Sequence, residues 1–187
     1  MMAVRLIRSL RMLRYWTKER QRVKTKNIAG DKGLYTVPAK LQGEWYSMDN
    51  NRRTHSKYTN QLIKIEFGTH TLTTEDHQYE IHILDKEYFE KHQQFSNDYL
   101  NDTHTWVKVF NNTEPLKGVN YINLIGWTAK DNHQTSYGYT LLDQEPVIIL
   151  ASGQEKITDQ VYWKTPELAK KHQDQNFDKL ITKAENN

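Results

Sequence analysis

Cysteine is absent from this sequence, so disulfides, thiolate nucleophiles and thiolate metal ligands are excluded. Glycine and proline are scarce, at eight and four residues, which argues against a low-complexity chain. No apolar run approaches the roughly 18 residues that a membrane-spanning helix needs. These absences favour a folded, polar domain, and none of them decides the compartment in which the protein works.

The chain is poor in hydrophobic residues but rich in aromatic ones. Only 36% of its 187 residues are hydrophobic, yet 11% are aromatic, including 5 Trp and 11 Tyr. Because large rings can build a core from few positions, this composition favours a folded domain over a disordered chain. A chain of this length is expected to hold one domain with appended ends. We place a basic extension and linker at 1–37 and the domain at 38–187.

Positive charge is concentrated at the amino terminus. Residues 1–33 contain ten of the 26 Lys and Arg residues but only Glu19 and Asp31 among the 23 acids. Residues 34–187 therefore keep 16 bases and 21 acids, a net charge of −5. A nucleic-acid-binding face needs clustered positive charge, so no nucleic-acid partner is expected for the globular part.

Within the extension, residues 3–16 space arginines three apart, with leucines at helical spacing between them. This pattern fits an amphipathic basic helix that would make peripheral contact with an anionic membrane. Two other interpretations stay open: an extension without a specific role, or an N-terminus that is not the native start of an exported protein. Arginines interrupt each apolar stretch and no A-x-A-like site follows, so a secretory signal is not recognisable.

From Gly43 onward the dominant period is two, which predicts β-strands. QLIKIEF (61–67), for example, places Ile63, Ile65 and Phe67 on one face. Further strands are predicted at 69–74, 79–84, 105–110, 119–129, 135–143, 146–152 and 156–164. Short strands separated by turn signals are typical of a sandwich or a small closed barrel.

Two segments have helical character. DKEYFEKHQQFSNDYL (85–100) spaces its aromatic residues by four, three and four, which indicates a short amphipathic helix or a structured excursion. In the segment 165–184, Thr165 can cap a helix and Pro166 suits its first position. The prediction is a mainly β protein: an antiparallel up-and-down barrel of about eight strands over about 38–164, with a C-terminal α-helix at 165–184.

The motif Gly43-Glu44-Trp45 at the start of the first strand resembles the G-x-W motif of lipocalins and other calycins. In those barrels the tryptophan closes the base and a basic side chain from the end of the last strand packs across it. The resemblance implies barrel closure by Gly43, Trp45 and Lys164, with lysine in place of the more usual arginine. A cation over an indole face contributes about 0.5–2 kcal/mol.

VPAKLQGEWYS near the front and ILASG with VYWKTPELAKK near the back are similar to a group of uncharacterised small β-proteins of lactic acid bacteria. This likeness covers most of residues 36–172. It implies a barrel that is exported and associated with the cell envelope, and it carries over no catalytic residues. This chain departs from the group because it has no recognisable signal peptide.

Aromatic residues recur along the predicted strands, and in a closed barrel alternate positions point inward. One interpretation is a packed aromatic core. A second is an interior wide enough to hold a small apolar ligand, and a third is an exposed row that stacks on cell-wall sugars. The predicted ligand-binding residues of the interior are Tyr46, Trp106, Tyr121, Trp127, Tyr137 and Tyr139, with Trp163 in the same aromatic set.

Histidines and carboxylates gather between 70 and 82 and suggest a metal site. The residues are His70, His77 and His82, with Glu75, Asp76 and Glu80 nearby. No i,i+4 histidine pair fixes them on one element, and solvated polar faces explain them at least as well. We assign no metal site and no cofactor.

Ser152, Asp159 and a histidine could form a hydrolase triad, but Ala151-Ser152-Gly153-Gln154 lacks the G-x-S-x-G pattern of a nucleophile turn. Ser152 is better explained as the end of a strand, and we assign no catalytic residue.

The sequence therefore favours a non-enzymatic binding protein, extracellular or associated with the envelope, for a small apolar ligand or a cell-surface component. The alternative is a structural, interaction or inhibitor module whose barrel is filled, and an enzyme ranks third. A monomer is expected. A cytoplasmic location is the alternative to secretion, because no clear signal peptide is present.

Overall fold

The computed structural model describes residues 27–48, 61–92, 94–110, 118–129, 134–152 and 157–174. The proposed membrane helix at 3–16 lies outside these residues. In the described part of the chain, the strands are β1 Asp31–Leu34, β2 Gly43–Met48, β3 Leu62–Phe67, β4 Thr71–Thr73, β5 Gln78–Leu84, β6 Trp106–Val109, β7 Asn120–Gly126, β8 Thr135–Leu142, β9 Glu145–Ser152 and β10 Ile157–Trp163, and the helices are α2 Lys86–Lys91, α3 Asn97–Asp102 and α4 Pro166–Lys171.

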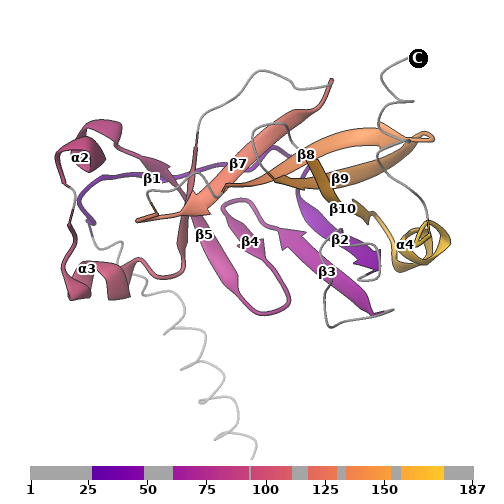
Figure 1. The fold of residues 1–187 in the computed structure, drawn as a ribbon, viewed down its shortest axis with the longest axis horizontal. Coiled ribbons are helices and arrows are strands. Elements are labelled where there is room, and N and C mark those ends of the chain that lie inside the picture. The colour runs from indigo at the N-terminus through magenta and orange to yellow at the C-terminus, as the bar shows by residue number, and fades with distance from the viewer. Residues whose placement is uncertain are drawn as a thin grey trace, which may run out of the picture.

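Nine strands close into a barrel in the order β5-β4-β3-β2-β10-β9-β8-β7-β6, with β6 pairing back onto β5. The prediction of a small closed barrel is confirmed, with nine strands instead of about eight. The prediction of an all-antiparallel, up-and-down barrel is wrong, because β5 and β6 pair in parallel, with Ile81 opposite Val107. Parallel neighbours need a crossover connection, and α2 and α3 lie in it (Figure 1).

The tenth strand, β1, pairs antiparallel with β5 outside the closed ring, with Leu34 opposite His82. The sequence predicted a linker here, and the structure differs. Within β1, the Gly33 amide donates a hydrogen bond to Asp31 Oδ1 at 2.8 Å. Val37, just after β1, is only 1% exposed, so the chain is already packed against the barrel before residue 38.

Inward side chains of the barrel strands form one hydrophobic core. On β3 the predicted face, Ile63, Ile65 and Phe67, is buried. Trp45 from β2 and Tyr162 from β10 belong to the same core. The core continues around the ring with Leu72, Ile81, Ile122, Leu124, Tyr137 and Ile148, and Val37 and Leu41 pack into it from the segment between β1 and β2.

A second core lies on the outer surface of β7, β8, β9, β10 and β2, and α4 packs against the part of it on β2 and β10. We call it the outer cluster: Met48, Val119, Tyr121, Leu142, Val147, Ile149, Ala151, Val161, Trp163 and Ala169, with Tyr46 and Leu168 packed against it. Figure 1 shows α4 on the side of the barrel opposite α2 and α3. Because β9 is covered on both faces, its sequence PVIILAS has no polar alternation.

α4 begins as the sequence predicted. Thr165 is its N-cap, accepting from the Leu168 amide at 3.3 Å, and Pro166 occupies its first turn. The helix ends at Lys171, and the predicted continuation from 175 to 184 lies outside the described residues. The predicted helical segment at 85–100 consists of two short helices, α2 and α3, capped by Asp85 and Ser96.

One end of the barrel, which we call the base, is filled by Trp45. Its indole is 1% exposed, and Nε1 donates to the Leu41 carbonyl at 2.7 Å. Lys164 Nζ lies 4.1 Å from the centre of the ring. Gly43 has a φ of +101°, and a Cβ there would lie 3.0 Å from Lys164 Nζ, so glycine lets the lysine cross the indole.

Replacing Trp45 by Ala should lower the free energy of unfolding by about 3–5 kcal/mol, because the ring leaves a large hole in the interior core. Lys164→Met keeps most of the side-chain volume but removes the charge, so it should cost only about 0.5–1 kcal/mol at this exposed position. Urea denaturation measures both values. Equal losses in the two variants would show that the indole does not fill the base.

Candidate functional site

A cavity of about 450 Å³ lies at the other end of the barrel, where β10 begins. We call it the cavity. β10 runs from this end to Lys164 at the base, so the closed and hollow ends are opposite. The cavity is lined by Ile63, Lys64, Ile65, Thr74, Glu75, Asp76, Tyr137, Leu150, Ser152, Asp159, Gln160 and Tyr162.

The lining divides into an apolar floor and a polar rim. Ile63, Ile65 and Leu150 belong to or pack against the interior core, so they face the inside of the barrel. The turn after β4 supplies Glu75 and Asp76, which are exposed, so the cavity reaches solvent on that side. Such a division suits a molecule with an apolar body and a polar group near water.

One wall of the cavity is fixed by hydrogen bonds between β2 and β10. Gln160 is 1% exposed, and its Nε2 donates to Ser47 Oγ at 2.8 Å and to the Met48 carbonyl at 3.0 Å. Ser47 Oγ in turn donates to the Val161 carbonyl at 2.6 Å. In the described ladder between β10 and β2, Trp163 lies opposite Tyr46, and these side-chain hydrogen bonds connect the two strands beyond that pair. This wall of the cavity is therefore formed without a ligand.

Tyr137 places a hydroxyl group among apolar neighbours. Its side chain is 6% exposed, and its ring meets Phe67 edge to face with centroids 5.2 Å apart. Among the described residues the hydroxyl has no hydrogen-bond partner, and the side chain lines the cavity. Burial raises the pKa of the phenol above its ordinary value, and Tyr162 and Tyr79 add to the rise. The group is therefore a neutral hydroxyl, available as donor or acceptor.

Of the six aromatic residues predicted to bind a ligand, the structure places only Tyr137 in the lining of the cavity. Tyr139 points into the barrel at the base, with its ring centroid 6.3 Å from that of Trp45. Tyr46 and Tyr121 lie on the outer cluster, as does Trp163. Trp106 and Trp127 pack against each other and against His82, with ring centroids 5.4 Å apart between the two indoles.

Most residues of the lining could not be recognised as ligand-binding from the sequence. Ile63 and Ile65 were assigned to one face of a strand, but that face was not connected to a ligand. Leu150, Gln160 and Tyr162 lie on strands whose two faces are both buried, so no alternation marks them as inward. One sequence pattern could have identified part of the lining. Apolar and polar residues alternate strictly along β3, so its apolar face must point into the barrel.

A third group, the aromatic cluster, combines the buried residues His82, Lys108 and Trp127 with the partly buried residues Phe89, Phe95, Tyr99 and Trp106. The imidazole of His82 is stacked on Trp106 at 3.6 Å between centroids. Lys108 is 5% exposed, and its Nζ donates to the carbonyls of Trp127 and Ala129 at 2.8 and 2.9 Å. Trp127 Nε1 donates to the Tyr99 hydroxyl at 2.8 Å, which links α3 to the barrel.

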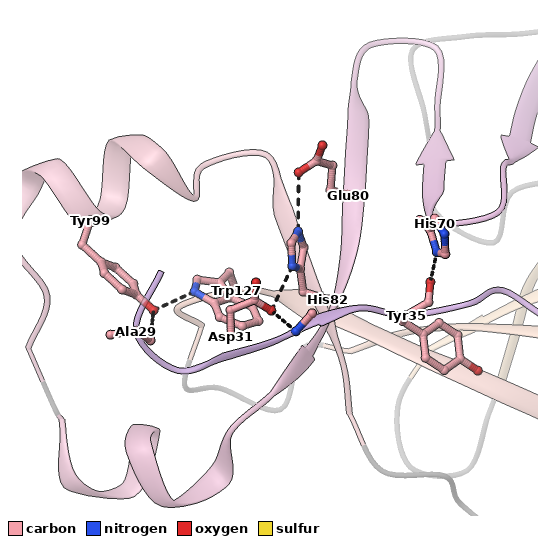
Figure 2. Close-up of polar contacts among 9 residues, drawn as sticks. Ala29, Asp31, Tyr35, His70, Glu80, His82, Tyr99 and Trp127 are labelled. Atoms are coloured by element: carbon pink, nitrogen blue, oxygen red, sulfur yellow. Dashed lines mark hydrogen bonds and ion pairs between the residues drawn. The ribbon is translucent and has the colours of Figure 1, made fainter. Parts of the chain in front are cut away.

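Figure 2 shows His82 between two carboxylates. Nδ1 lies 3.1 Å from Asp31 Oδ1 on β1, and Nε2 lies 3.5 Å from Glu80 Oε2 on β5. Because carboxylates only accept, both contacts are hydrogen bonds at once only when both ring nitrogens carry protons. The Tyr99 hydroxyl also donates to the Ala29 carbonyl at 2.9 Å. These contacts attach the chain before and within β1 to the barrel.

The histidines proposed as metal ligands have separate partners. His70 Nδ1 is 2.9 Å from the Tyr35 carbonyl oxygen (Figure 2), and the His77 ring is stacked on Tyr79. The carboxylates of Asp31 and Glu80 lie on opposite nitrogens of His82, so they do not converge on one point. Across the described ranges, no group of three or more His, Asp or Glu residues could hold a metal ion.

Ser152 and Asp159, the other two members of the hydrolase hypothesis, both line the cavity. The described lining contains no histidine to serve as their base. Within the described lining, the structure therefore brings Ser152 and Asp159 to one cavity with no histidine beside them.

No known family model matches this sequence, and no curated protein or solved structure compared with it gives a significant match. The fold established here is a small closed β-barrel of nine strands. None of the helices among the described residues is long and apolar enough to span a membrane.

Tyr137→Phe should change how stability depends on alkaline pH. Because burial raises the phenol pKa in the native state, the unfolded chain loses this proton first as pH rises past its ordinary value of 10.0. Stability from the neutral phenol is therefore complete below pH 10 and falls above it, by up to about 1.4 kcal/mol per pH unit. Measured by urea denaturation between pH 8 and 11, the free energy of unfolding should fall less steeply with pH in the variant than in the wild type. Identical slopes would show that the native phenol ionises freely.

His82→Phe keeps a ring against Trp106 but removes the bonds to Asp31 and Glu80. It should lower the free energy of unfolding by about 1–3 kcal/mol, because Asp31, only 15% exposed, loses a hydrogen-bond partner. Amide hydrogen exchange of β1 should accelerate more than that of β3. His77→Phe, at an exposed position, is the control. Unchanged exchange in β1 would contradict the role of His82 in attaching that strand.

Proposed function

We propose that this protein is a non-enzymatic binding protein that holds a small, largely apolar molecule in the cavity. The observation that supports this most directly is the combination of about 450 Å³ of space with an apolar floor from Ile63, Ile65 and Leu150. Ligand sites in proteins are concave, mostly apolar spaces of a few hundred cubic ångströms with a few polar groups. Small barrels use their open end in this way.

We also propose that the barrel is calycin-like. The support is the geometry at the base, where Gly43, Trp45 and Lys164 stand as the resemblance implies and Lys164 Nζ lies 4.1 Å from the indole centre. The parallel pairing of β5 with β6 and the ninth strand set it apart from the eight-stranded antiparallel lipocalins. The proposed likeness to calycins therefore concerns how the base is closed. The order and pairing of the other strands differ from those of lipocalins.

The likeness to β-proteins of lactic acid bacteria supports a place outside the cell or at its envelope, where the ligand would be a small apolar molecule or a component of the surface. We propose that the protein acts there as a monomer, with peripheral membrane contact through residues 3–16 as an added anchor. A cytoplasmic location is the alternative, and fractionation of the host cells with an antibody to the barrel distinguishes the two.

A filled barrel that acts as a structural, interaction or inhibitor module is the competing function. It draws support from the base, where Trp45, Phe67 and Tyr139 occupy the interior. The two functions differ in whether the cavity is used, so they respond differently to filling it.

Ile63→Trp should abolish ligand binding, because the larger side chain points into the cavity and occupies its floor. Leu62→Trp is the matched control: it lies next to Ile63 on β3, is 39% exposed and faces outward. Native mass spectrometry of both proteins and the wild type, purified from the host, measures whether a small molecule is carried. The ligand should accompany the wild type and the Leu62 variant only. A wild type that carries nothing and binds no apolar probe would favour the filled-barrel module.

A further inference from the structure

β1 is held on the barrel by few backbone bonds. Across the described ranges it pairs with one strand, the second half of β5, and the register of this pairing is irregular. At one end of the pairing the Tyr35 amide donates to the Ile81 carbonyl at 2.7 Å. At the other end the Asp85 amide donates to the Gly30 carbonyl at 2.9 Å. Short segments with few such bonds open locally at low cost, so side-chain contacts decide how firmly β1 is attached.

Asp31 on β1 and His82 on β5 supply the main side-chain contact (Figure 2). Asp31 Oδ1 accepts from the Gly33 amide at 2.8 Å and lies 3.1 Å from His82 Nδ1. A carboxylate only accepts hydrogen bonds, so Nδ1 carries the hydrogen when the imidazole is neutral. The other nitrogen, Nε2, then presents a lone pair to Glu80 Oε2 at 3.5 Å. Two acceptors face each other in this neutral form, and a proton on Nε2 removes the conflict.

The imidazole of His82 is fixed in this orientation by its neighbours. Its side chain is 5% exposed, and the ring lies flat on Trp106 with centroids 3.6 Å apart. The edge of the Trp127 ring closes a second side at 5.7 Å. The ring therefore keeps its two nitrogens directed at the two carboxylates, and a positive charge on it lies over an indole face, which is a favourable position for a cation.

The other titratable groups around this contact have their own partners. Lys108 lies opposite His82 on β6, and its Nζ is bound to the carbonyls of Trp127 and Ala129. This cation opposes a charge on the imidazole, whereas two carboxylates at the ring nitrogens favour it. The remaining groups on the adjacent elements are the Tyr99 hydroxyl on α3, bound to Trp127 and Ala29, and the exposed pair of Lys32 with Asp85 at 3.8 Å.

We propose that His82 is a pH-sensitive latch for β1. When Nε2 takes up a proton from solvent, the bond from Nδ1 to Asp31 joins two opposite charges, and such bonds are about twice as strong as neutral ones. Histidine side chains gain this proton between about pH 8 and 5. β1 is thus held more firmly at mildly acidic pH, and this added attachment is lost as the pH rises and the proton leaves.

Opening of the latch changes the surface of the barrel. Without β1, the backbone of β5 from His82 to Leu84 loses its partner strand, and Ile83, already 42% exposed, lies on this edge. A free edge of this kind can pair with another strand. The inference concerns the attachment of β1 alone, so it holds whether or not the cavity binds a ligand.

Amide hydrogen exchange of the full chain at pH 5.5 and pH 7.5 tests the latch. Each rate is divided by the rate of an unstructured peptide at the same pH, because exchange itself depends on pH. The Tyr35 and Asp85 amides report on β1, and the amides of β3 are the internal reference. Protection of the two reporters, relative to β3, should be at least about threefold higher at pH 5.5. Carboxylates ordinarily stay ionised across this window.

Three variants locate the proton. His82→Phe keeps a ring on Trp106 but cannot titrate, so protection of the reporters should be low and equal at the two pH values. Asp31→Asn keeps the size of the side chain and removes its charge, so the ratio should fall below about twofold. His70→Asn is the matched control: His70 Nδ1 lies 2.9 Å from the Tyr35 carbonyl, and asparagine keeps a donor that does not titrate. The ratio should survive in this variant.

The wild-type series decides the proposal even if a variant fails to fold. Equal relative protection at the two pH values, or higher protection at pH 7.5, would overturn it. A ratio that persists in His82→Phe, or one that disappears in His70→Asn, would place the proton on another group and contradict the latch. An NMR titration of the His82 imidazole should show its proton uptake over the same pH range as the gain in protection, and a His82 ring that stays neutral throughout this range would refute the proposal.

Discussion

The indole of Trp45 decides which end of this barrel is closed. It fills the base, donates its N–H to the Leu41 carbonyl and lies under Lys164, so the end of β10, the start of β2 and the segment before β2 meet at one ring. Toward the other end, the described interior side chains leave a cavity of about 450 Å³, with Ile63, Ile65 and Leu150 as its apolar floor.

The strands themselves could be predicted from the sequence, and their neighbours could not. Period two in QLIKIEF located β3 and its inward face, and the same pattern located β4 to β10 within a few residues. Side chains alternate between the two faces in parallel and antiparallel strands alike, so the sequences of β5 and β6 do not show that these strands pair in parallel. β1 was missed because Asp31, Lys32 and Gly33 show no apolar period; tertiary contacts of Asp31 with His82 hold it.

The aromatic residues were harder to place for a related reason. In a barrel with one solvated face, an aromatic residue on a strand points inward by default. Here α4 packs against part of the outer cluster and the aromatic cluster lies beside α2 and α3, so both faces of several strands are buried. Tyr121 and Trp106 thus look in sequence like Tyr137, although only Tyr137 reaches the cavity. The closure at Trp45 was easier to find, because Gly43 before the first barrel strand's tryptophan and Lys164 after the last strand mark it at the two ends of the barrel sequence.

The barrel is plugged at the Trp45 end and hollow, with an apolar floor, at the other. A crystal structure grown with 1-bromo-octane tests this most directly, because bromine is located by its anomalous scattering without assumptions about the fold. We expect bromine beside Ile65 and Leu150, with Trp45 and Lys164 in contact at the base. An interior closed by the chain's own side chains at both ends, with bromine only on the outer surface, would contradict it.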